Sequence, residues 1–193
     1  MIRDAVPADR AAIAAMLARA FADDPAMAYI FPDPRDRAKR LPKLFGLLFD
    51  ADAPGMRLVT GDAEAATLWQ RPGTPVAGTL DLLRRAVPLV TTLGFALPRA
   101  LRVGDALDAH APPERHWYLH IAGVDPAQQG KGLGGASIRE GLARAAADGL
   151  PAYLETATER NVGLYQSLGF VVTSEWNVPK GGPKFWSMLR QPD

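Results

Sequence analysis

The sequence predicts an α/β fold, more closely a mixed α+β one, in which a mixed and largely antiparallel sheet of six to seven strands carries helices on both faces. Two observations support this prediction. Strand-like and helical segments alternate in the second half of the chain, and the first half contains two strands joined by a short turn, which pairs them antiparallel. With 193 residues, 48% of them hydrophobic and 22% charged, we expect one domain over 1–193 with an ordinary core.

The first elements are a strand over residues 1–5 and a helix that starts at Pro7, because apolar residues then recur at helical spacing. These apolar residues are Ile13, Met16, Leu17, Ala20 and Phe21. We expect further helices over 25–31 and 35–49.

A β-hairpin is expected next. Residues 56–60 and 65–69 have the composition of strands, and Gly61 with Asp62 supplies the turn between them. Residues 78–110 are helix-like. Their helices are expected to break at four residues, which are Pro88, Gly94, Pro98 and Gly104.

The second half predicts four strands, over 116–124, 152–156, 170–178 and 184–190. Strand alternation divides the first of them into two faces. One face carries His116, Tyr118, His120 and Ala122, and the other carries Trp117, Leu119 and Ile121.

A glycine-rich stretch follows the first of these strands and precedes a helix expected over 136–147. It reads Gln129-Gly130-Lys131-Gly132-Leu133-Gly134. Glycines let backbone N–H groups approach phosphate oxygens, and the dipole of the following helix adds positive potential. We therefore expect a phosphate-bearing ligand on this loop.

Two common phosphate motifs do not account for the loop. A P-loop requires a serine or threonine after its lysine, but Gly132 follows Lys131 here. A dinucleotide fingerprint should begin at the end of a strand, whereas five residues lie between Val124 and Gly130.

Gln129, Gly132 and Gly134 fill the pattern Q/R-x-x-G-x-G/A, so the loop resembles the coenzyme A pyrophosphate loop of the GNAT superfamily of N-acetyltransferases. A second motif of the family follows about thirty residues later, with a strand at 152–156, Asn161 to Tyr165 on a short helix and then Leu168-Gly169-Phe170. The segments LETATERN and YQSLGF, and VP before the last strand, are most similar to the puromycin N-acetyltransferase branch.

The resemblance implies a GNAT-type sheet in which residues 1–115 supply acceptor-pocket helices and residues 116–193 bind acetyl-CoA. It implies that Tyr165 lies beside the coenzyme A sulfur and protonates the departing thiolate; simple packing beside Leu164 and Leu168 is the alternative. The implied cofactor contacts are Ala122, Val124, Gln129, Gly130, Lys131, Gly132, Leu133, Gly134 and Asn161. Asn161 and Lys131 could instead be ordinary polar residues at helix starts.

The sequence leaves the identity of the general base open. Many family members carry a glutamate at the position that aligns with Tyr118. His120 on the same predicted face, Glu155 on the next strand, or an ordered water held by either residue could remove the amine proton. His120 could equally be a packed strand residue.

The predicted acceptor is a small, partly hydrophobic amine of low pKa. The expected pocket walls are Phe21, Tyr29, Phe31, Trp69, Leu82, Leu83, Leu89 and Phe95. Few acidic residues lie near these wall residues in the sequence, and examples are Asp81, Asp105 and Asp108. The alternatives are a protein N-terminus or lysine as acceptor, or a non-catalytic module that binds acyl-CoA.

Composition narrows the remaining functions. The net charge of +1 gives no support for nucleic-acid binding, and three dispersed histidines without cysteine indicate no metal site. Without a cysteine to carry an acyl group, acetyl transfer should be direct. We expect a cytoplasmic protein, because the chain has no cysteine and so no disulfide. We expect no membrane span, because the apolar stretch 86–97 is too short. A homodimer is compatible with the sequence.

Overall fold

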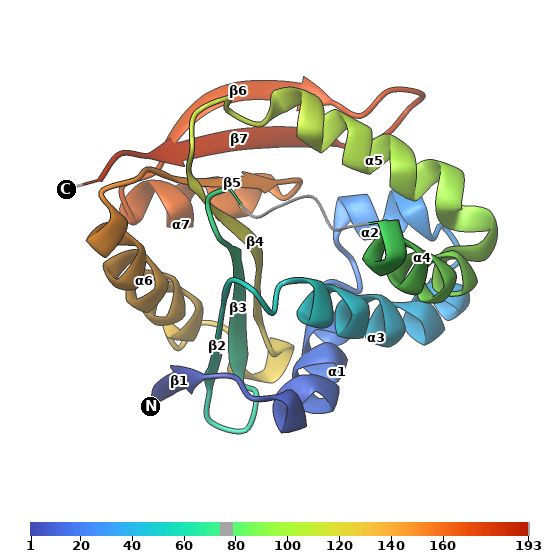
Figure 1. The fold of residues 1–193 in the computed structure, drawn as a ribbon, viewed down its shortest axis with the longest axis horizontal. Helices are drawn as coiled ribbons and strands as arrows, with labels where there is room; N and C mark the ends of the chain where they lie inside the picture. Colours follow the sequence, from blue (N-terminus) through green and yellow to red (C-terminus); the bar gives the residue numbers. More distant parts are fainter. Residues whose placement is uncertain (74–78, 193) are drawn as a thin grey trace.

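The computed structural model describes residues 1–73 and 79–192, except for the side chains of residues 79–85. These residues form a seven-stranded sheet of order β1-β2-β3-β4-β5-β7-β6 (Figure 1). The strands are β1 (Ile2–Asp4), β2 (Met56–Thr60), β3 (Ala65–Gln70), β4 (Trp117–Val124), β5 (Ala152–Thr156), β6 (Val171–Asn177) and β7 (Lys184–Arg190). Strands β4 and β5 pair in parallel and the other pairs are antiparallel, which confirms the predicted mixed sheet.

One face of the sheet is covered by the helices of the first half of the chain. They are α1 (Arg10–Ala20), α2 (Pro25–Ile30), α3 (Pro34–Ala51), α4 (Thr79–Leu93) and α5 (Leu97–His110). The Asp33 carboxylate starts α3 by accepting hydrogen bonds from the N–H groups of Arg35 and Asp36, a cap that typically stabilises a helix by about 1 kcal/mol. The core on this face includes Leu17 and Phe45.

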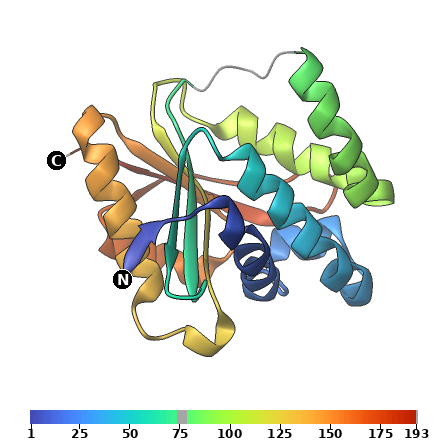
Figure 2. The same ribbon diagram turned by 60° about the horizontal axis from the view of Figure 1, so that its bottom comes forward.

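The opposite face is covered by α6 (Leu133–Ala145) and α7 (Val162–Ser167), as Figure 2 shows for α6. Here α6 lies close to β3, because Gly141 leaves room for the indole ring of Trp69. A Cβ atom at Gly141 would lie 2.5 Å from that ring. Trp69 is completely buried in this second core.

The prediction of four helix breaks in 78–110 was largely wrong. Pro88 lies inside α4 and Gly104 inside α5, while Pro98 occupies the first turn of α5, where a missing N–H costs nothing. The chain breaks at Gly94, which has a φ of 51° and opens a single 3-10 turn, Gly94–Ala96.

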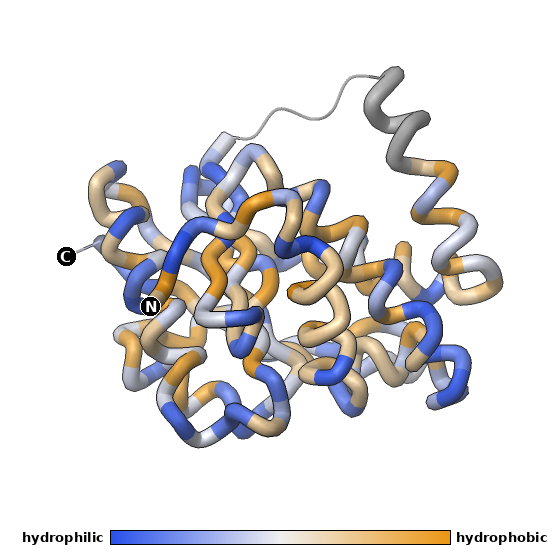
Figure 3. Tube along the Cα trace, turned by 90° about the horizontal axis from the view of Figure 1, so that it is seen from below, coloured by the Kyte–Doolittle hydropathy of each residue, from blue (hydrophilic) through white to orange (hydrophobic). Residues whose placement is uncertain are grey.

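The stretch Ala86–His110 is long and apolar enough, by length and composition alone, to cross a membrane. An 18-residue window within it has a mean hydropathy of 1.2, and 22% of that window is buried. Figure 3 shows its α4 part at the rim of the molecule, where Val87 is exposed; Phe95 is fully exposed at the turn. Because Gly94 breaks the stretch into two helices, it does not form one straight rod.

A β-bulge interrupts the pairing of β4 with β3. Trp69 pairs with Leu119, whereas Leu68 pairs with Ile121, so His120 is an extra residue on β4. Residues that face each other in an antiparallel pair share a face of the sheet, and a bulge therefore reverses the alternation along its own strand.

The predicted division of this strand into two faces is wrong beyond the bulge. Trp117 and Leu119 pack together in the core under α6, as expected. Ile121, which was expected on the same face, packs in the core under α1. Ala122 packs on the side of Trp117 and Leu119 and not with Tyr118. The bulge thus redirects the side chains of β4 in the middle of the sheet.

Candidate active site

The parallel strands β4 and β5 separate soon after they meet. Their ladder consists of Trp117 with Ala152 and Tyr118 with Tyr153. Beyond Tyr118, β4 continues to Val124 and pairs only on its other edge, with β3, in the described part of the chain. Figure 1 shows β5, β7 and β6 turned relative to β2, β3 and β4. The unpaired edge of β4 offers backbone N–H and C=O groups to a ligand that contains amides.

The glycine loop lies where β4 ends and α6 begins. Gly130 and Gly132 have φ values of 79° and 76°, which favour glycine. Both are exposed, and a Cβ atom on either would meet no heavy atom within 4 Å. Gly132 is also the N-cap of α6, so the free N–H groups and the positive end of the helix dipole face open space. The loop therefore fits a diphosphate.

Neighbouring side chains hold this loop in place. The Asp125 carboxylate accepts a hydrogen bond from the N–H of Ala127 and pairs with Arg19 of α1. The side-chain amide of Gln129 donates to the Val124 carbonyl at 3.5 Å, and Lys131 Nζ donates to Gln128 Oε1 at 2.6 Å. Gln129 and Lys131 thus have contacts within the loop, and both remain at least partly exposed.

Tyr165 lies on α7 with only 7% of its surface exposed. Burial, together with the negative charge of Asp24, raises the pKa of Tyr165 to about 12. Asp24 belongs to the other face of the sheet, where its carboxylate accepts hydrogen bonds from the N–H groups of Ala26 and Met27. Asn161 is partly exposed at the N-cap of α7. Tyr165 is therefore a protonated hydroxyl at neutral pH.

Glu155 is the acid on β5. Burial raises the pKa of Glu155 to about 6, and the hydroxyls of Tyr118 and Tyr153 and the charge of His120 oppose that shift. Its Oε2 atom is buried without a hydrogen-bond partner among the described residues. A carboxylate with this pKa is ionised at pH 7 and can accept a proton.

His120 is held by a buried acid that the sequence analysis missed. Its Nδ1 lies 2.7 Å from Oδ2 of Asp52, at the end of α3, and the Asp52 side chain is inaccessible to solvent. The Gln70 amide donates to Oδ1 of Asp52 at 2.9 Å. The His120 ring also stacks on Tyr118, with 5.4 Å between ring centroids. Asp52 is 68 residues from His120, and no local motif marks it.

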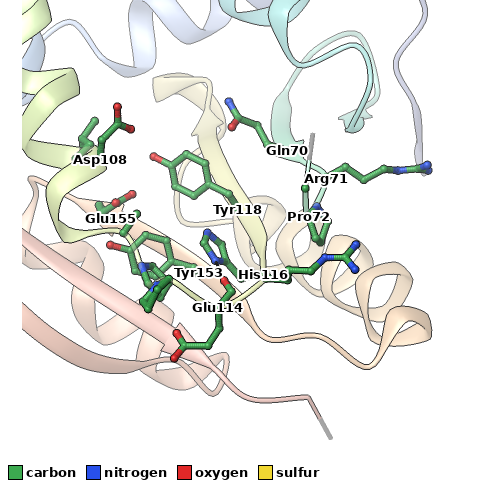
Figure 4. A pocket seen from close by; sticks show the side chains of 15 residues that line it. Gln70, Arg71, Pro72, Asp108, Glu114, His116, Tyr118, Tyr153 and Glu155 are labelled. Atoms are coloured by element: carbon green, nitrogen blue, oxygen red, sulfur yellow. Dashed lines mark hydrogen bonds between the residues drawn. The ribbon is translucent and has the colours of Figure 1, made fainter. Parts of the chain in front are cut away.

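A pocket of about 420 Å³ opens between the start of β4 and the end of α5 (Figure 4). We refer to it as the β4–α5 pocket. Its lining consists of Gln70, Arg71, Pro72, Gly73, Leu107, Asp108, Ala111, Pro112, Pro113, Glu114, Arg115, His116, Tyr118, Tyr153 and Glu155. The glycine loop follows the opposite end of β4, beyond the part of this strand that has no pairing with β5 among the described residues.

The hydrophobic residues predicted as pocket walls do not line the β4–α5 pocket where the structure describes their side chains. Phe31 and Trp69 are buried in the two cores, and Phe21 packs against the first core. Phe95 is fully exposed. Tyr29 hydrogen-bonds with Arg102 and Leu89 packs against the first core, while Leu82, Leu83 and Asp81 lie outside the described side chains. The pocket is instead lined by three acids, two arginines and several aromatic and proline residues. Of the acids named from the sequence whose side chains the structure describes, Asp108 lines the pocket and Asp105 does not.

Comparison with known proteins places these features in a family. Residues 63–170 match the acetyltransferase (GNAT) family. An uncharacterized N-acetyltransferase of Schizosaccharomyces pombe, C550.08, is 27% identical over 197 residues, which cover 93% of this chain and 78% of that protein.

Solved structures share the fold over the whole chain. The histone acetyltransferase HPA2 and related acetyltransferase from Corynebacterium glutamicum is 25% identical with a TM-score of 0.70, and the match covers 100% of this chain and 96% of that one. Arylalkylamine N-acetyltransferase 2 from Aedes aegypti is 16% identical with a TM-score of 0.63, over 100% and 99% of the two chains.

Proposed function

Because the chain belongs to the GNAT acetyltransferase family and is an acetyl-CoA-dependent N-acetyltransferase, we propose that it acetylates the amine of a small molecule bound in the β4–α5 pocket. The observation that carries the proposal is the pocket itself. Its volume of about 420 Å³ lies in the range of small-ligand sites. Glu155, an acid with a pKa of about 6, lines it.

The residues expected to hold acetyl-CoA fit that molecule. Gly130 and Gly132 leave open space before the N-terminus of α6 for the diphosphate. The unpaired edge of β4, with Ala122 and Val124, offers backbone groups to the amides of the pantetheine arm. We assign the remaining predicted contacts to the same ligand, namely Gln129, Lys131, Leu133, Gly134 and Asn161.

Acetyl-CoA supplies an activated thioester, and two side chains move the protons. Glu155 accepts a proton from the ammonium group of the acceptor, which frees the nitrogen lone pair to bond with the acetyl carbon. Tyr165 gives its proton to the sulfur as the carbon–sulfur bond breaks. The new amide nitrogen loses a proton that restores Tyr165, and the proton on Glu155 returns to solvent.

We assign the role of general base to Glu155 in preference to His120. The lining of the pocket includes Glu155 and does not include His120. Because the Nδ1 atom of His120 donates to Asp52, only its Nε2 atom could accept a proton. Glu155 also has a buried oxygen atom without a partner among the described residues, which leaves it available to the amine. On this assignment His120 and Asp52 shape the site beside the base.

Acetylation of a protein N-terminus or lysine is the alternative, and the experiment must separate the two. We would measure thiol release from acetyl-CoA with a panel of arylalkylamines, aminoacyl amides, puromycin, polyamines and short peptides. The proposal expects the highest kcat/KM for a small molecule. A peptide preferred by an order of magnitude or more would contradict it. If acetyl-CoA binds but none of these amines causes thiol release, the proposed acetylation of a small molecule is contradicted as well.

Two other expectations from the sequence stand as proposals. We propose a cytoplasmic location, because the chain of 193 residues contains no cysteine and so no disulfide. We also propose kinship with the puromycin N-acetyltransferase branch on the motifs LETATERN and YQSLGF, which is why puromycin is in the panel.

A further inference from the structure

Three carboxylates line the β4–α5 pocket, and they belong to Asp108, Glu114 and Glu155. Asp108 lies on α5 and Glu155 on β5 (Figure 4). The negative charge of Asp108 contributes to the raised pKa of Glu155, so the two groups are close enough to interact. Two like charges that share a site favour either a proton or a bound cation between them.

The position of Asp108 is fixed by the anchoring of α5 on the sheet. The Tyr153 hydroxyl forms hydrogen bonds with the backbone carbonyl of His110, at 3.1 Å, and with Oγ of Ser187, at 2.9 Å. The His110 ring stacks on Trp176 with 4.2 Å between centroids and 8° between planes. The last turn of α5, which carries Asp108, is thus tied to two strands, β5 through Tyr153 and β6 through Trp176.

We propose that the acceptor binds through an ammonium group between Asp108 and Glu155, and that the pocket therefore selects α-amino amides and esters over free α-amino acids. This inference rests on the proposed function and names the chemical class of its acceptor. A free α-amino acid has a carboxylate on the carbon that bears the amine, so that carboxylate would lie beside both acids and be repelled. In an amide or ester this charge is absent.

The other charged groups of the pocket are compatible with this selection. Arg71 and Arg115 line the pocket and also an adjoining depression with Pro72, Asp148 and Leu150, whose lining includes neither Asp108 nor Glu155. Figure 4 shows Arg71 on the far side of Tyr118 from Asp108 and Glu155.

The remaining groups that face Glu155 are the aromatic side chains of Tyr118, His120 and Tyr153. Tyr118 and His120 face it from β4 and Tyr153 from its own strand, and Tyr118 and Tyr153 have raised pKa values. Both hydroxyls therefore stay neutral near pH 7. Glu114 and His116 line the pocket from the segment between α5 and β4. Glu114 thus adds a third negative charge to the pocket lining, beside the charges of Asp108 and Glu155.

The class also suits the chemistry of the base. An α-amino group has a pKa of about 7.7–8.0, against about 10.4 for a lysine-like amine. A carboxylate with a pKa of about 6 can therefore take a proton far more readily from the former. Asp108 assists twice, because it attracts the ammonium form and also raises the pKa of the base.

The test compares L-phenylalaninamide with L-phenylalanine, a pair that differs in a carboxamide against a carboxylate. kcat/KM is measured by thiol release from acetyl-CoA for the intact wild-type protein, for Asp108→Asn and for Asp105→Asn. Asp105 is an exposed acid one turn earlier on α5, outside the pocket lining, and makes the matched control. Taking the ratio between variants cancels the intrinsic difference between the two amines.

We expect the wild type to prefer the amide, and Asp108→Asn to reduce that preference about tenfold, mainly through a higher KM for the amide. The acid limb of its pH profile should move to lower pH, because the charge that raises the pKa of Glu155 is gone. Asp105→Asn should leave both unchanged. An unchanged preference in Asp108→Asn, or a wild type that prefers phenylalanine, would overturn the inference.

Binding without turnover separates this inference from the proposed function. Calorimetry of L-phenylalaninamide against the protein saturated with coenzyme A measures recognition alone. Weaker binding to Asp108→Asn than to Asp105→Asn supports the ammonium site even if no acetylation is detected, in which case only the proposed function fails. Equal binding to the two variants, or no binding to the wild type, refutes the site even if other amines are acetylated.

Discussion

The Asp52 carboxylate accepts a hydrogen bond from Nδ1 of His120 across 2.7 Å, and it does so without any solvent exposure of its own side chain. The same carboxylate accepts a hydrogen bond from Gln70. Since His120 is the extra residue of the β-bulge in β4, this contact ties the bulge to the end of α3. The pair therefore joins the helices of the first half of the chain to the strand that borders the active site.

Asp52→Ala should destabilise the protein more than it impairs the chemistry. It leaves the partly buried polar groups of His120 and Gln70 without their carboxylate acceptor, which typically costs about 1–3 kcal/mol of unfolding free energy. If Glu155 is the base, kcat per folded molecule should fall less than about tenfold. Urea unfolding and steady-state kinetics measure the two effects. An unaltered stability with a thousandfold lower kcat would point to His120 as the base instead.

Glu155→Gln should stabilise the protein near neutral pH while it removes activity. The pKa of Glu155 is raised on folding to about 6, so its ionisation costs more in the folded chain than in the unfolded one. Wild-type stability is therefore lost as pH rises from about 4.5 to 6, by about 2 kcal/mol at most. The glutamine variant carries no such charge.

The measurement is unfolding of Glu155→Gln and wild type at pH 4.5 and pH 7.5. We expect the variant to gain about 1–2 kcal/mol at pH 7.5 and little at pH 4.5, with kcat about 10²- to 10⁴-fold lower. Glu159→Gln, at an exposed position, is the control and should change neither quantity. A gain that is the same at both pH values would argue against a raised pKa at Glu155.

The sequence predicted the strands and the glycine loop because their signals are local. Alternation of apolar residues marks β4 and β5, and Gln129 to Gly134 is a continuous motif. The β-bulge at His120 could not be predicted, because it is defined by the pairing of β4 with β3. The sequence of one strand does not determine its register with the neighbouring strand. The predicted side-chain alternation failed from Ile121 onward.

The pocket could not be predicted for a similar reason. Asp108 reaches it because Tyr153 and Trp176, more than forty residues later, anchor the end of α5. Trp69 was assigned to the pocket from its size and apolar ring, but Gly141 of α6 admits that ring into the core. In both cases the position of a side chain depends on contacts distant in the sequence.

Tyr165→Phe should lower turnover and leave cofactor binding almost unchanged. The variant keeps the buried ring and its contact with Phe170, and it removes the hydroxyl whose raised pKa keeps it protonated. We expect kcat to fall by about 10²–10⁴. Tyr29→Phe removes a hydroxyl that contacts Arg102 and serves as control. Full activity of the Tyr165 variant with a verified acceptor would exclude it as the proton donor.

Gly132→Asp should abolish acetyl-CoA binding, because it places a negative side chain where the diphosphate is expected and strains a backbone with a φ of 76°. A control variant must separate the effect of backbone strain from the effect of the added charge, and Gly149→Asp is that control. Gly149 also has a positive φ, 62°, and open space around its Cα, but it lies at the opposite end of α6 from the loop. Gly149→Asp should therefore lose similar stability and retain binding. Calorimetry with acetyl-CoA on both folded variants makes the comparison, and equal affinities would show that the glycine loop is not the diphosphate site.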